Sequence, residues 1–72
     1  MTSDEARAIA ASALGETSAN HLQVAFVLEK EGDWVILLTR GGQDWVVRVP
    51  VQEAPTADLF RRRVAQEVQR LF

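Results

Sequence analysis

The chain contains no cysteine and only one histidine among its 72 residues. Without cysteine it can form neither a disulfide nor a thiolate metal site. His21 is the single imidazole, and the sequence places no set of carboxylates around it that would complete a metal site. We therefore expect no metal and no cofactor, and we expect the apolar core alone to hold a domain of this size together.

Long apolar runs and a net positive charge are also missing. No run approaches the ~20 apolar residues that a membrane helix needs. Residues 1–5 are acidic and lack the basic start and apolar core of a signal peptide. We expect a cytoplasmic protein with no membrane contact. The net charge of −2 argues against a general binder of nucleic acid or of anionic membranes.

No arrangement of residues predicts catalysis. A nucleophile–base pair would need His21 beside Thr17 or Ser18, and no third group is placed to orient the histidine. The acidic residues within 29–33 lie at a predicted hairpin tip, which is more typical of a solvated turn than of a cation site. Gly41-Gly42 lies between two predicted strands rather than before a helix, so it offers no phosphate cradle. We predict that the chain is not an enzyme and has no small-molecule substrate.

The residues that are present indicate one globular domain over residues 1–72. Apolar residues make up 47% of the chain and charged residues 25%, which is typical of a soluble globular domain. A first helix is predicted to begin at Thr2 or Ser3, where Thr2 and Glu5 have the spacing of a capping box, and to end at Gly15, a residue that can adopt left-handed geometry. A last helix is predicted to follow Thr56 as its N-cap.

Three segments between these helices alternate between apolar and polar residues, as strands do. Gly41-Gly42 suits a two-residue hairpin loop, which would pair Arg40 with Gln43. Residues 30–32 suit a three-residue loop, which would pair Leu28 with Trp34. Both registers place Trp34, Trp45 and most large apolar side chains on one face of the sheet. The sequence predicts an α+β fold, α-β-β-β-α, in which a three-stranded antiparallel meander sheet carries both helices packed on one face.

The second face of this predicted sheet is also apolar at its centre. Its expected members, with a polar rim around them, are Ala25, Val27, Val35, Leu37, Val46 and Arg48. An open face of an antiparallel sheet is normally polar, whereas an apolar centre inside a polar rim is typical of an interface. We predict a non-enzymatic protein-interaction module whose partner is a second copy, forming a homodimer. The other interpretation is that one helix covers each face, so that these residues are core.

The last helix suggests a different function, RNA binding. It carries four arginines, Arg61, Arg62, Arg63 and Arg70, and the order of elements resembles that of double-stranded-RNA-binding domains and of small toxin nucleases that share their fold. The resemblance covers the whole chain as topology only. The basic helix start of the first group is not clearly present, and the second hairpin reads Gly41-Gly42-Gln43-Asp44-Trp45 without the histidine-centred motif of the second, so no family is assigned. Successive helix residues point about 100° apart, which makes a solvated helix face the competing interpretation.

Overall fold

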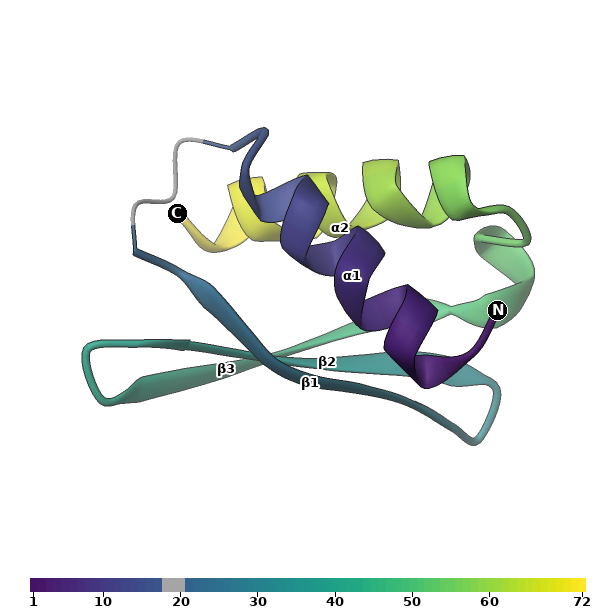
Figure 1. The fold of residues 1–72 in the computed structure, drawn as a ribbon, viewed down its shortest axis with the longest axis horizontal. Helices are drawn as coiled ribbons and strands as arrows, with labels where there is room; N and C mark the ends of the chain where they lie inside the picture. The colour runs from purple at the N-terminus through teal and green to yellow at the C-terminus, as the bar shows by residue number, and fades with distance from the viewer. Residues whose placement is uncertain (18–20) are drawn as a thin grey trace.

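The computed structural model describes residues 1–17 and 21–72. The elements follow the order α1 (Ser3–Leu14), β1 (Gln23–Lys30), β2 (Asp33–Arg40), β3 (Gln43–Pro50), the short 3-10 helix η1 (Val51–Glu53) and α2 (Ala57–Leu71). The strands form one antiparallel sheet in the order β1-β2-β3. Both helices lie on the same side of this sheet, and α1 crosses α2 there (Figure 1). The predicted α+β fold is confirmed.

Neither helix within the described ranges has the length and apolar character that crossing a membrane requires.

Both helices begin at threonine N-caps, as the sequence predicts. The Thr2 hydroxyl accepts a hydrogen bond from the Glu5 backbone N–H at 3.1 Å, and the Glu5 carboxylate accepts one from the Thr2 N–H at 3.2 Å. This reciprocal pair is the predicted capping box. The Thr56 hydroxyl likewise accepts from the Leu59 N–H at 3.2 Å. Each cap satisfies a backbone donor that the first turn of a helix leaves without an intrahelical acceptor.

Helix α1 ends at Leu14, but the predicted left-handed geometry of Gly15 is wrong. Gly15 has φ −65° and ψ −17°, which is right-handed helical geometry. Its N–H donates to the Ser12 carbonyl at 3.1 Å, so the helix ends by tightening into a short 3-10-type turn rather than by a left-handed cap.

The β2–β3 hairpin has the predicted register. Gly41 and Gly42 have φ values of 56° and 83°, the positive values that a type I′ turn requires at both positions. Arg40 therefore pairs with Gln43, and the register continues without a shift to Trp34 opposite Val49. The apolar pairs predicted for the helix-covered face, Trp34–Val49, Ile36–Val47 and Leu38–Trp45, all lie on that face.

The β1–β2 hairpin does not have the predicted three-residue loop. Glu31, with φ 54°, and Gly32, with φ 84°, form a two-residue loop, so Lys30 pairs with Asp33. A β-bulge at Ala25 then shifts the register by one residue between Val24 and Phe26. The sequence interpretation failed because it allowed left-handed geometry only to glycine, whereas here Glu31 also adopts it. Between the loop and the bulge, every side chain of β1 points to the face opposite to the predicted one.

The core lies between the sheet and the two helices. Its largest fully buried side chains are Phe60, Ile36, Leu38, Val49, Val64 and Val68. The Phe60 ring lies 5.8 Å from the Trp34 ring, which joins α2 to the central strand. Three fully buried alanines, Ala6, Ala10 and Ala13, line α1 where it approaches the rest of the core. Their small side chains let the two layers approach closely.

Trp45 lies at the edge of this core rather than inside it. Its ring is partly buried and meets the Phe72 ring edge to face at 5.2 Å. The Arg40 guanidinium lies 5.6 Å from the Trp45 ring centre and 4.5 Å from that of Phe72. Trp45 thus faces the predicted side of the sheet, where it packs against the last residue of the chain.

Candidate functional site

One side of the sheet faces away from both helices (Figure 1), and its centre is apolar. We call this side the outer face. Its apolar members, which the strand registers bring together, are Phe26, Leu28, Val35, Leu37 and Val46. The exposed fractions of Val46, Phe26 and Leu28 are 59%, 43% and 37%. These residues form a contiguous patch, because Phe26 pairs with Leu37 and Leu37 pairs with Val46.

Charged and polar side chains stand at the two ends of this patch. Lys30 and Asp33 are register partners at one end, and the Arg48 guanidinium lies 3.5 Å from the Asp33 carboxylate. Thr39 and Asp44 are register partners at the other end. The outer face therefore has the composition of an interaction surface, with an apolar centre and polar ends.

The structure places four of the six predicted surface residues on the outer face. Val35, Leu37, Val46 and Arg48 lie there as predicted. The interpretation that one helix covers each side of the sheet is wrong, because α1 and α2 share the other side (Figure 1).

The predicted positions of Val27 and Ala25 differ from those in the structure, and for Val27 the prediction is wrong. Val27 is 5% exposed and belongs to the core, because the two-residue loop turns it toward the helices. Ala25 lies at the bulge, outside the regular register, and is partly buried. Phe26 and Leu28 take the places expected for the predicted β1 residues. A two-residue Glu31-Gly32 loop would have predicted both residues. Such a loop pairs Lys30 with Asp33, and this register places Leu28 opposite Val35 and Phe26 opposite Leu37.

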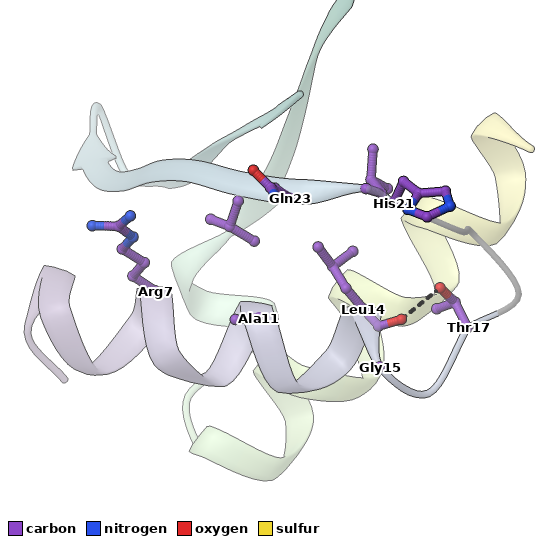
Figure 2. Close-up of a pocket in the computed structure, with 9 residues that line it drawn as sticks. Arg7, Ala11, Leu14, Gly15, Thr17, His21 and Gln23 are labelled. Atoms are coloured by element: carbon purple, nitrogen blue, oxygen red, sulfur yellow. Dashed lines mark hydrogen bonds between the residues drawn. The ribbon is translucent and has the colours of Figure 1, made fainter. Parts of the chain in front are cut away.

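A hollow of about 670 Å³ lies between α1 and the start of β1 (Figure 2). Arg7, Thr17, His21 and Gln23 contribute its polar lining, and Leu14 is among the apolar residues. The Thr17 hydroxyl donates to the Leu14 carbonyl at 2.9 Å, so this hydroxyl proton is directed at the α1 backbone.

Two of the features considered for chemistry can be placed only in part. His21 is exposed at the margin of the hollow, and Ser18, the other nucleophile considered for it, lies outside the described residues. Across residues 1–17 and 21–72, no three acidic, histidine or cysteine side chains are grouped as metal ligands. The acidic side chains of the β1–β2 tip, Glu29 and Glu31, are exposed to solvent.

The arginines of α2 are paired with carboxylates. Arg61 binds both Glu16 and Asp58, with 2.7 Å between Arg61 and the Asp58 carboxylate. Arg62 binds the same Asp58 carboxylate at 3.2 Å. The hydrogen bond from Arg61, followed by the charge of Arg62, lowers the pKa of Asp58, and the same Asp58 contact, followed by Glu16, raises the pKa of Arg61.

The other two arginines are paired in the same way. Arg63 lies 2.6 Å from Glu53 and 3.5 Å from Glu67, and Arg70 lies 3.0 Å from Glu67. Each of the four α2 arginines therefore already faces a carboxylate on the same surface. An anionic ligand would be repelled by these carboxylates, which weakens the case for a nucleic-acid site on α2.

Comparison of the chain with protein-family models, with curated proteins and with solved structures finds no match. The candidate site therefore depends on the geometry of this chain alone.

Proposed function

We propose that the protein is a non-enzymatic protein-interaction module that uses the outer face to form a homodimer. The observation that carries this proposal is the patch of apolar side chains that neither helix covers, with Leu37 at its centre. A second copy suits this face because a two-fold axis pairs the patch with the identical patch of the other copy, so that neither patch remains exposed to bind a third chain. The ends of the face carry both cations and anions, so opposite charges of two identical copies can be placed together.

The dimensions of the face indicate a weak association. Three strands of eight residues each, at about 4.8 Å per strand and 3.3 Å per residue, cover roughly 380 Å² on each copy. Side-chain relief raises this flat product, but the total for two copies stays near the lower limit of about 1,000 Å² for a stable interface. We therefore expect a dissociation constant in the micromolar range.

Sedimentation equilibrium over a series of protein concentrations tests the proposal. The wild-type chain is expected to change from monomer to dimer across the micromolar range. Leu37→Glu should weaken this association at least about a hundredfold, because each copy would bring an unpaired carboxylate into the apolar contact. A wild-type chain that stays monomeric at high micromolar concentration would remove the homodimer, and association that survives Leu37→Glu would remove the outer face as its site.

Leu59→Glu is a matched control for this experiment. Leu59 is 40% exposed on α2, away from the outer face, and it occupies the third helical position after the Thr56 cap. A glutamate there would complete a capping box, so the fold should be retained. The control should dimerise like the wild type, which separates the loss of the patch from a general effect of replacing an exposed leucine by glutamate.

RNA binding through Arg61, Arg62, Arg63 and Arg70 is the weaker proposal, because their carboxylate partners would have to be displaced or left close to phosphate. The two functions differ in their response to salt. Phosphate binding weakens steeply as the salt concentration rises, whereas apolar association does not. RNA that fails to bind even at low salt concentration would exclude this second function.

A further inference from the structure

We infer that Arg48 and Asp44 determine how two copies pair: the two sheets stack with their strands antiparallel, and Arg48 of each copy faces Asp44 of the other. This inference rests on the proposed homodimer and adds its orientation and its specificity. Both residues lie on the outer face of β3, on opposite sides of Val46. Asp44 is exposed, and none of the ion pairs formed within residues 1–17 and 21–72 includes it.

The strand registers divide the outer face into four rows. One end row contains Lys30, Asp33 and Pro50, and the next contains Leu28, Val35 and Arg48. The third row contains Phe26, Leu37 and Val46, and the other end row contains Gln23, Thr39 and Asp44. The two apolar rows are thus central, and the charge is different at the two ends.

Two two-fold arrangements stack this face on itself with the strands of the two copies aligned. In the first, the two-fold axis lies between the two sheets, perpendicular to the strands, and passes between the two central rows. Each strand then lies over the same strand of the second copy and runs antiparallel to it. Leu28 then lies over Phe26 of the second copy and Val35 over Leu37, which buries the patch. Arg48 lies over Val46 of the second copy, beside Asp44.

In the second arrangement, the axis runs along β2 and the strands stay parallel. Asp33 then lies over Asp33 of the second copy, and Arg48 lies next to Lys30. Both contacts bring like charges together. Like charges also meet in the first arrangement, where Asp33 lies near Asp44 of the second copy, and Lys30 lies near Asp33 of the second copy in the second arrangement, so repulsion alone does not separate the two. The two arrangements differ at Asp44, which lies over Gln23 with no cation beside it in the second arrangement and beside Arg48 in the first. We take the first arrangement because only it gives the exposed Asp44 an opposite charge.

The distances allow the proposed contact. Stacked sheets lie about 10 Å apart, and residues two apart along a strand are separated by about 7 Å. The long Arg48 side chain, which is already half-exposed beside Asp33, can cross that gap to reach Asp44 of the second copy. Because the axis repeats each contact, a dimer contains two such pairs.

Charge exchange between these positions tests the orientation. In a dimer of Arg48→Asp chains, each introduced carboxylate would face Asp44, and in a dimer of Asp44→Arg chains each introduced guanidinium would face Arg48. Either variant alone should associate at least about tenfold more weakly than the wild type. An equimolar mixture of the two should recover near wild-type association, because both contacts in a mixed dimer unite opposite charges.

Native mass spectrometry, with the two variants distinguished by mass, gives the readout. One-to-one mixed dimers in clear excess over either homodimer support the inference. This recovery also excludes an effect on folding alone. Arg48→Asp places a carboxylate beside Asp33 of the same chain, and mixing with the Asp44→Arg variant would not repair a fold that this repulsion had destabilised. If the mixture associates no better than either variant alone, the proposed orientation is wrong. The proposed function still stands in that case if the wild type dimerises and the Leu37→Glu variant does not. A wild-type chain that is monomeric overturns both.

Discussion

Two adjacent residues of β1 provide a direct test of how the strand is oriented. Val27 is 5% exposed in the core, whereas Phe26 is 43% exposed on the outer face. We consider the same substitution, to aspartate, at each position in turn. The register with a two-residue Glu31-Gly32 loop predicts very different costs, whereas the register with a three-residue loop predicts the reverse order.

The cost at position 27 is large. Val27→Asp loses about 1.5 kcal/mol of apolar burial and requires several kcal/mol more to hold an unpaired carboxylate away from water. The sum of about 5 kcal/mol is comparable with the total stability of a 72-residue domain, which is about 4–11 kcal/mol. We therefore expect this variant to be largely unfolded at neutral pH, with a loss of far-ultraviolet circular dichroism and exposure of the Trp34 indole.

The cost at position 26 is small. Phe26→Asp loses part of a half-buried ring and some strand propensity, in all about 1–2 kcal/mol, or a fall in melting temperature of about 5–15 °C. Urea unfolding followed by tryptophan fluorescence, at a concentration where the wild type is monomeric, measures both variants. If Phe26→Asp proves more destabilising than Val27→Asp, the side chains of β1 point the other way and the outer face has been assigned incorrectly.

Two further predictions concern the core and the first helix cap. Phe60→Ala should lower the free energy of unfolding by about 3–5 kcal/mol, because it empties the fully buried contact with Trp34; a loss below about 1 kcal/mol in urea unfolding would contradict this packing. The backbone N–H of Thr2, followed by its hydroxyl, lowers the pKa of Glu5 below the ordinary 4.5, so the cap stabilises the fold above that value and this contribution disappears as the pH falls through the lowered pKa. The difference in stability between the wild type and Glu5→Gln should accordingly shrink on acidification, and a difference that stays constant with pH would show that the Glu5 charge contributes nothing to the cap.

The local signals in the sequence were sufficient for most of the fold. The threonine caps, the helical spacing of the buried residues and the Gly41-Gly42 loop each depend on interactions within a few residues. The position of both helices on one side followed from where Trp34 and Trp45 face. These features could be predicted because each element's apolar side has to be buried, and the face that carries Trp34 and Trp45 holds most of the large apolar side chains of the sheet.

The β1 register could not be read in the same way. A two-residue loop requires Glu31 to adopt a conformation that few non-glycine residues adopt, so the sequence favours a longer loop in which Gly32 alone adopts it. Placing Phe26 in the core is also the expected choice from hydrophobicity alone. The candidate site was therefore assigned to the correct face, with Val35, Leu37 and Val46 in place, but its β1 members were wrong by one position.

The bulge at Ala25 has a consequence for the way in which copies of this chain can assemble. β1 and β3 are both edge strands, and an edge that accepts a strand from another copy leaves a new edge free, so the chain can grow into an open-ended fibre. The bulge interrupts the regular ladder near the start of β1, and at the end of β3 Pro50 has no backbone N–H to offer a further strand. The β1 edge is therefore a poor template and the β3 edge is limited at one end, whereas contact through the outer face ends after two chains.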